Sequence, residues 1–75
     1  MTLGELTKVF CNDTLVVIKL YNNSRIGVGG QLLYSGKLYG YSNYLNEQWP
    51  DNNFKSFNVI NVNVVDNHLD ILIEE

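Results

Sequence analysis

The strongest constraint on the fold is the alternation of apolar and polar residues in the last third of the chain. Apolar residues occupy every second position over 60–64 and again over 69–73, and Asp66-Asn67-His68 separates the two runs. An alternation with a period of two is typical of a strand that buries one face, and turn-forming residues between two such runs indicate a hairpin. The residues predicted to form the buried face of this antiparallel hairpin are Ile60, Val62, Val64, Leu69, Ile71 and Ile73.

Two short helices and two further strands are predicted before this hairpin. Thr2 and Glu5 have the spacing of a capping box, which begins a helix, and Pro50 ends a second helix. Residues 14–21 are rich in β-branched side chains, which favour a strand. In chain order, the predicted elements are a helix ending near 12–13, a strand over 14–21, a strand over 31–39 and a helix over 42–48.

Each of these elements is predicted to turn an apolar face toward a shared core. Gly36, in the middle of the second strand, indicates a bulge or a close approach of the backbone to another group. The fold class that follows is α+β, with a small antiparallel sheet of about four strands and two short helices in the order αββαββ, in a single domain over 1–75. The residues predicted to share one face of each element are Leu3, Leu6, Val9 and Phe10, then Val16, Ile18 and Leu20, then Leu32, Tyr34 and Leu38, and finally Tyr41, Tyr44, Leu45, Gln48 and Trp49. Of the last group, Tyr41, Tyr44, Leu45 and Trp49 are predicted to pack in the core.

The length of the chain makes such a domain marginal in stability. A chain of 75 residues buries only about 60% of its unfolded surface, and small domains often depend on a disulfide, a metal or a partner subunit. Cys11 is the single cysteine, so an internal disulfide is excluded, and this residue is expected to be packed or half buried at the end of the first helix. The apolar fraction of 45% then favours either an efficient core or a homo-oligomer, and we expect a homo-oligomer.

Charge and hydropathy exclude several classes of partner. The net charge is −3, whereas proteins that hold duplex nucleic acid by its phosphates are normally basic. No segment approaches the roughly 20 apolar residues of a membrane-spanning helix, and the first residues do not resemble a signal peptide. The sequence therefore predicts a cytoplasmic protein that binds neither duplex nucleic acid nor a membrane.

No combination of residues in the sequence indicates catalysis. The only histidine, His68, falls in the predicted hairpin turn, far along the chain from Cys11, so a catalytic pair of the two is not expected. The cluster 66–70 lacks the further ligands of a calcium or zinc site. Gly27-Val28-Gly29-Gly30 precedes a predicted strand, whereas a phosphate-binding glycine loop leads into a helix. We therefore expect no enzymatic activity, no catalytic residue, no bound metal and no cofactor.

Five aromatic residues crowd into the segment 34–49 and are the best indication of function. Tyrosine and tryptophan combine an apolar face with a hydrogen-bonding group, so such a cluster is either core or a contact surface. If the cluster is a ligand site, we expect the bases of a ligand to stack on the tyrosine rings and nearby basic side chains to bind its phosphate. The same surface would also suit a protein partner. The predicted ligand-binding residues are Tyr34, Tyr39 and Tyr41 for stacking, Lys37 and Arg25 for the phosphate, and Asn43 for a base edge.

The chain also resembles small uncharacterised proteins of phages and prophages of low-GC Gram-positive bacteria. The resemblance rests on Thr2-Leu3-x-Glu5-Leu6, Thr14-Leu15-Val16-Val17-Ile18, Tyr34-x-Gly36-x-Leu38 and Leu69-x-Ile71-x-Ile73. It implies a non-enzymatic counter-defence role, and three functions are predicted on that basis. The first is sequestration of a small nucleotide-like signalling ligand in the host cytoplasm. The alternatives are an inhibitor, similar to anti-CRISPR proteins, that occludes a host defence enzyme, and a structural or assembly protein.

Overall fold

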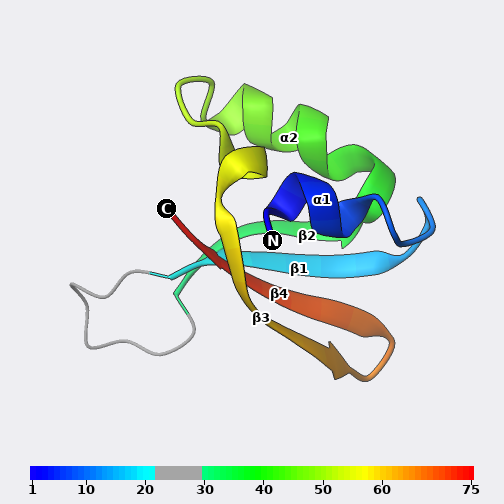
Figure 1. Ribbon diagram of the computed structural model, residues 1–75. Helices are drawn as coiled ribbons and strands as arrows, with labels where there is room; N and C mark the ends of the chain where they lie inside the picture. Colours follow the sequence, from blue (N-terminus) through cyan, green and yellow to red (C-terminus); the bar gives the residue numbers. More distant parts are fainter. Residues whose placement is uncertain (22–29) are drawn as a thin grey trace.

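The chain folds into one four-stranded sheet with helices packed on it, as a computed structural model of residues 1–21 and 30–75 describes (Figure 1). The α+β class and the αββαββ order are confirmed, with a short 3₁₀-helix added on each side of the second helix. No helix within the described ranges is both long and apolar enough to cross a membrane. The elements are α1 (Leu3–Thr7), β1 (Leu15–Leu20), β2 (Gln31–Lys37), η1 (Leu38–Gly40), α2 (Tyr41–Gln48), η2 (Phe54–Ser56), β3 (Asn58–Val65) and β4 (His68–Glu74).

The sheet is mixed, with the strand order β2-β1-β4-β3. The prediction of an antiparallel sheet is confirmed for the pairs β1–β2 and β3–β4, but it is wrong for the two central strands, β1 and β4, which run parallel. A parallel pair needs a long crossover, and the segment 38–57 with α2 provides part of it. The alternation of apolar and polar residues identifies a strand, but it does not record the direction of the neighbouring strand. The sequence therefore predicted the strands but not the parallel pairing of β1 with β4.

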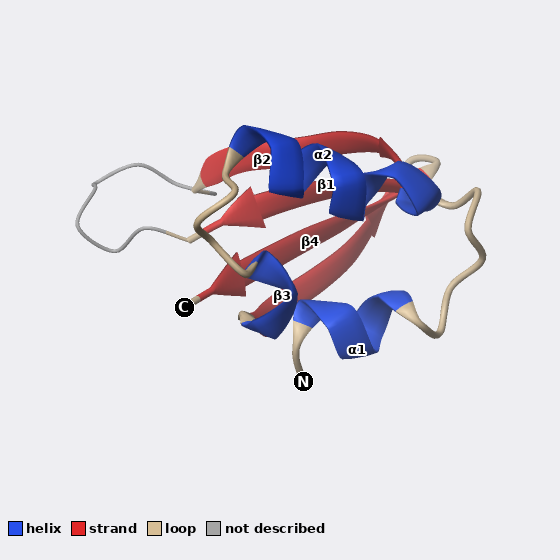
Figure 2. Cartoon of the chain, turned by 90° about the horizontal axis from the view of Figure 1, so that it is seen from above, coloured by secondary structure: helices blue, strands red, loops and turns tan. Residues whose placement is uncertain are grey.

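The helices of residues 1–21 and 30–75 all lie on the same face of the sheet, so that in this part of the chain the opposite face has no helix on it (Figure 2). The core lies between the helices and the two central strands, where alternate residues of β1 and β4 are buried as predicted. The buried core residues are Leu3, Leu6, Val16, Ile18, Leu33, Leu38, Tyr41, Leu45, Phe54, Leu69, Ile71 and Ile73.

An irregularity in β2 changes which of its residues face the helices. The pairing of β1 with β2 shifts register between Ile18 and Lys19, which leaves Leu33 as an extra residue in β2. Leu33 is buried, whereas Leu32 pairs with Lys19 and is 56% exposed. The prediction that Leu32 shares the core face with Tyr34 is therefore wrong, because one inserted residue reverses the alternation. The strand also ends at Lys37, before η1.

The first helix is shorter than predicted, and the segment after it is exposed. α1 ends at Thr7, and Val9 is 69% exposed rather than in the core. Cys11 is also exposed, against the prediction that it is packed or half buried. A helix of five residues makes little more than one turn, so tertiary packing of Leu3 and Leu6 holds it in place rather than helix propensity.

The predicted capping box at the start of α1 is present, and it makes the stability of the fold depend on the protonation of one carboxyl group. Glu5 accepts a hydrogen bond from the Thr2 N–H (2.8 Å), and Thr2 Oγ1 accepts one from the Glu5 N–H (3.2 Å). The backbone bond from Thr2, followed by the bond to its side chain, lowers the pKa of Glu5 below its usual value of 4.5. Because the pKa of Glu5 is lower in the folded protein than in the unfolded one, its ionised carboxylate stabilises the fold at pH values above the unfolded pKa. This stabilisation is lost as the pH falls through the folded pKa.

We therefore expect the unfolding temperature to decline as pH falls below about 4.5, with Glu5 contributing part of the decline. A Glu5→Gln variant should lose stability near neutral pH and should show a shallower decline on acidification than the unmodified protein. Glu47→Gln, at an exposed position of α2, serves as the matched control. Parallel pH curves for the Glu5→Gln variant and the unmodified protein in thermal unfolding would count against this role of the carboxylate.

Candidate functional site

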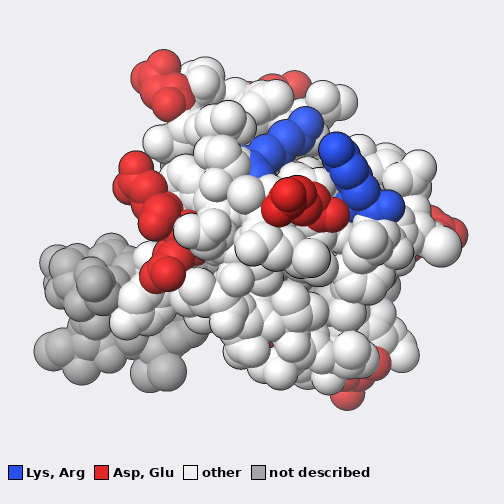
Figure 3. All heavy atoms as spheres, viewed as in Figure 1, with Lys and Arg blue, Asp and Glu red and all other residues white. Residues whose placement is uncertain are grey.

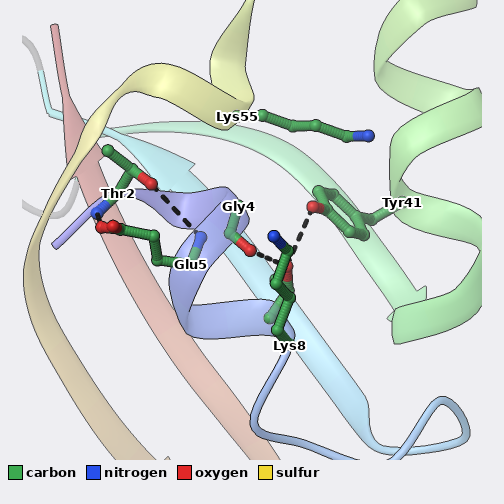
Figure 4. A pocket seen from close by; sticks show the side chains of 7 residues that line it. Thr2, Gly4, Glu5, Lys8, Tyr41 and Lys55 are labelled. Atoms are coloured by element: carbon green, nitrogen blue, oxygen red, sulfur yellow. Dashed lines mark hydrogen bonds between the residues drawn. The ribbon is translucent and has the colours of Figure 1, made fainter.

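A cavity of about 440 Å³ lies where α1, α2 and η2 meet, and two lysines are among the residues that line it (Figure 4). We call it the lysine cleft. Its lining residues are Thr2, Gly4, Glu5, Thr7, Lys8, Tyr41 and Lys55.

Close packing of α1 against η2 brings residues from distant parts of the chain to this cleft. A Cβ atom on Gly4 would lie 3.3 Å from the carbonyl oxygen of Lys55, so the absence of a side chain allows the two backbones to approach closely. The Leu3 N–H also donates to the Phe57 carbonyl (2.9 Å), which ties the start of α1 to the end of η2. Lys55 is thereby held beside α1, on the same cleft as Lys8.

The inner wall of the lysine cleft carries two hydroxyl groups in one hydrogen-bonded chain. Thr7 Oγ1 donates to the Gly4 carbonyl (3.1 Å), and the Tyr41 hydroxyl lies 3.0 Å from Thr7 Oγ1. Because the single hydroxyl hydrogen of Thr7 is used on Gly4, Tyr41 donates to Thr7 and keeps its own lone pairs. Tyr41 is 7% exposed, so the ring is anchored in the core while its oxygen reaches the cleft.

The charged residues that line the lysine cleft carry a net positive charge. Lys8 and Lys55 both line it, and Glu5 is the one acidic residue among the lining groups. The Glu5 carboxylate accepts the Thr2 N–H and is thus engaged in capping α1. Within the described ranges, the one ion pair joins Lys19 to Asp70 (3.7 Å), on other elements. Figure 3 shows basic side chains gathered on this face of the molecule beside an acidic one. The arrangement suits an anion with more than one negative charge.

A second cavity, of about 300 Å³, lies between β2 and α2, and we call it the aromatic hollow. The ring centroids of Tyr34 and Tyr44 lie 5.4 Å apart, and the two ring planes are tilted by 53° to each other. The Trp49 ring contacts the Phe54 ring edge to face, with 5.8 Å between the ring centroids. Such contacts between aromatic rings stabilise by roughly 0.5–1.5 kcal/mol beyond area burial. The lining residues are Leu32, Leu33, Tyr34, Ser35, Tyr44 and Trp49.

Tyr34 is fixed by its own hydroxyl group, which lies over two glycines. The hydroxyl donates to the Lys37 carbonyl at 2.5 Å. A Cβ atom on either Gly36 or Gly40 would come within 2.9 Å of that oxygen, so the prediction of a close approach at Gly36 is confirmed. Burial, followed by the nearby Tyr39 phenol, raises the pKa of Tyr34 above its usual value. Tyr34 therefore forms one wall of the hollow and is held there by its hydrogen bond to Lys37.

Two of the predicted ligand residues, Tyr41 and Lys37, do not lie as the stacking hypothesis requires, and a third is not described by the structure. Tyr41 is buried, so its ring is not free to stack on a base as predicted. Lys37 pairs with Leu15, whose neighbour Val16 is buried in the core. Cross-strand partners share a face, so Lys37 belongs to the side of the sheet without helices. Arg25 lies outside the described residues.

The other three predicted residues are closer to the expected arrangement. Tyr34 is partly buried, and Tyr39, on η1, is 68% exposed beside it. Asn43 is exposed on α2. The structure thus keeps two tyrosines near each other, and it does not bring the five predicted residues that it describes into one cavity.

Lys8, Lys55 and Thr7 were missed by the sequence reasoning. Nothing in the local pattern links positions 8 and 55, because they meet only through the packing of α1 on η2. The one available signal was Gly4, a glycine inside a helix, which often marks a close approach of another backbone.

Comparisons with protein-family models, with curated proteins and with solved structures find no match for this chain. Its function is therefore inferred from its own residues and their arrangement.

Proposed function

We propose that this protein binds a small phosphorylated ligand in the lysine cleft and holds it without transforming it. The observation that carries the proposal is the convergence of Lys8 and Lys55 on a cavity whose wall presents the Tyr41 hydroxyl. Hydrogen bonds from ammonium groups to phosphate oxygens are charge-assisted and about twice as strong as neutral ones. Two such groups on one cavity favour a phosphate over a singly charged carboxylate.

The size of the cleft agrees with a ligand of this kind. Its volume of about 440 Å³ falls within the roughly 300–1,000 Å³ of small-molecule sites. The Tyr41 oxygen keeps lone pairs that can accept a hydroxyl or amino group of the ligand, and Thr7 fixes that oxygen in place. A sugar phosphate or a nucleotide would offer both a phosphate for the lysines and a donor for Tyr41.

The ligand class overlaps with the nucleotide-like ligand predicted from the sequence, but the phosphate is placed differently. In the sequence-based hypothesis Lys37 and Arg25 meet the phosphate, whereas here Lys8 and Lys55 do. A protein that only holds such a ligand lowers its free concentration, which is how a counter-defence protein of the predicted type would act on a nucleotide signal. The counter-defence role itself stays a proposal that rests on the resemblance to phage proteins.

Thermal unfolding with added ligands tests the proposal. Adenosine monophosphate and ribose phosphate are expected to raise the unfolding temperature, and adenosine is not, because it lacks the phosphate. A ligand at 100 times its dissociation constant adds about 2.7 kcal/mol to the free energy of unfolding.

Lysine variants supply the controls for this experiment. Lys8→Gln and Lys55→Gln should each weaken the ligand-induced shift, whereas Lys37→Gln, an exposed lysine on β2, should leave it intact. Loss of the shift in Lys37→Gln alone would instead support the site predicted from the sequence. No shift with any phosphorylated compound would contradict the proposal.

A protein partner that docks on the aromatic hollow is the second candidate. Among the residues that line this cavity, Leu32 is 56% and Tyr44 41% exposed, and tyrosine and tryptophan are enriched among residues that dominate binding energy. This surface corresponds to the inhibitor predicted as the alternative function. Under this candidate, Tyr44→Ala should abolish inhibition of a host enzyme, and the lysine variants should leave inhibition unchanged.

A further inference from the structure

Strand β3 has an edge that is open along most of its length. It is the last strand in the order β2-β1-β4-β3, so only one of its sides pairs with β4. Near its start, the Val59 N–H donates to the Met1 carbonyl (2.8 Å), and Thr2 forms an isolated bridge with Asn58. Within the described part of the chain no strand pairs with the outer side of 60–65.

This open edge lacks the features that usually prevent pairing with another strand. Native edges are commonly protected by charged side chains or bulges. β2, the other edge strand, has both, in Lys37 and the irregularity at Leu33. β3 contains no charged residue, and its irregularity lies at Ile60. The stretch 61–65 is thus a regular, uncharged edge.

Apolar side chains along this edge are exposed on the face that the helices cover elsewhere. Val62 and Val64 pair with Ile71 and Leu69, which are buried, so all four belong to the helix-side face. Val62 is nevertheless 36% exposed and Val64 77% exposed, which corrects the prediction that both lie in the core. The helices do not extend over this corner of the sheet, so the valines remain available for contact.

We propose that β3 pairs antiparallel with β3 of a second copy of this chain, so that two sheets join into one. The backbone of residues 57–59 is already hydrogen-bonded to the first residues of the chain, and the pairing of β3 with β4 is irregular at Ile60. The regular stretch with a free edge therefore runs from Asn61 to Val65. A two-fold arrangement that uses this whole stretch places its midpoint, Asn63, on the axis. Asn61 then faces Val65 of the second copy, and Val62 faces its Val64.

The second copy fits this edge because the stretch is complementary to itself. Val62 and Val64 of the two copies meet on the helix side, where each would cover the other's exposed apolar surface. Asn63 meets its own equivalent on the opposite face, where paired side-chain amides can each donate and accept. No like charges are brought together within the paired stretch.

The size of this interface predicts a weak dimer. Five residues on each side bury less than the roughly 800 Å² per partner of a standard stable interface. We therefore expect a dimer that forms near millimolar protein concentration and dissociates on dilution, which corresponds to a binding free energy of about −4 kcal/mol.

Cysteine cross-linking tests the register directly. In a Cys11→Ser background, Asn63→Cys is expected to form an interchain disulfide under mild oxidation, because residues opposite each other in an antiparallel pair have Cα atoms about 4.5–5.5 Å apart. Asn61→Cys is the matched control on the same face of the same strand. Its two copies would be offset by four residues, or roughly 13 Å, beyond the reach of a disulfide.

Equal cross-linking of both cysteine variants, or none for Asn63→Cys at high concentration, would overturn the proposed register. Sedimentation analysis supplies an independent measurement that does not depend on oxidation. Val64→Lys should abolish the concentration-dependent dimer, since it places charges opposite an apolar residue on both sides. Val9→Lys, at another highly exposed valine, should not. A protein that stays monomeric up to millimolar concentration would overturn the proposal as a whole.

Discussion

Replacing Ile71 by alanine is expected to lower the free energy of unfolding by about 2–5 kcal/mol, the range seen when large buried aliphatic side chains are truncated. Ile71 is 0% exposed and sits in β4, where it pairs with Ile18 of β1 on one side and with Val62 of β3 on the other. Truncation leaves a cavity at the centre of the sheet, which the neighbouring strands cannot fill without moving.

The loss at Ile71 is large relative to the stability of such a small domain. Each 1 kcal/mol shifts the unfolding temperature of a domain of this size by about 4–8 °C, so the variant should unfold at least roughly 10 °C lower or fail to fold. Val9→Ala, at a 69% exposed position, should stay within about 0.5 kcal/mol of the unmodified protein. Chemical denaturation measures the free energy of unfolding of both variants. Equal values for the two would contradict the position of Ile71 in the core.

Replacing Gly30 by alanine is expected to cost about 2–5 kcal/mol, because two separate penalties add. Gly30 has a φ of +74°, a left-handed conformation that costs an L-residue about 1–2 kcal/mol. A Cβ atom there would also lie 2.8 Å from the carbonyl carbon of Leu20 and even closer to its oxygen, which forces the backbone apart at about 1–3 kcal/mol. Leu20 pairs with Gln31 at this end of the β1–β2 hairpin.

Gly4→Ala provides the comparison for Gly30→Ala. Gly4 is helical, and an added Cβ would meet the Lys55 carbonyl oxygen at 3.3 Å, a tight but not prohibitive contact. The gain in helix propensity of up to about 1 kcal/mol offsets that contact, so a small net change is expected. If Gly30→Ala were as mild as Gly4→Ala in denaturant unfolding, the positive φ at Gly30 would not be required by the fold.

The fold was largely predictable because its strands carry strong local signals. The alternation at Leu69, Ile71 and Ile73 and the capping box of Thr2 and Glu5 each specify an element without knowledge of its neighbours. The parallel pairing of β1 with β4 and the extra residue Leu33 in β2 were not predictable in this way. Both depend on how distant strands meet, which local periodicity does not record.

The candidate site was less predictable, because its residues come together only in three dimensions. The sequence drew attention to the tyrosines, and Tyr41 does contribute its hydroxyl to the lysine cleft, although its ring is buried. Lys8 and Lys55 have no distinguishing local pattern, and a lysine on a polar surface is ordinary. Their approach follows from the contact of Gly4 with η2.

A titration followed by nuclear magnetic resonance tests the lysine cleft most directly. Adenosine monophosphate, added to the isotope-labelled protein, is expected to shift the backbone amide signals around Lys8 and Lys55 and those near Tyr41 at saturable concentrations. Adenosine alone should shift them little. Shifts confined to Tyr34, Lys37 and Tyr39, or no saturable shift with the phosphorylated compound, would contradict the account of the cleft as a phosphate site.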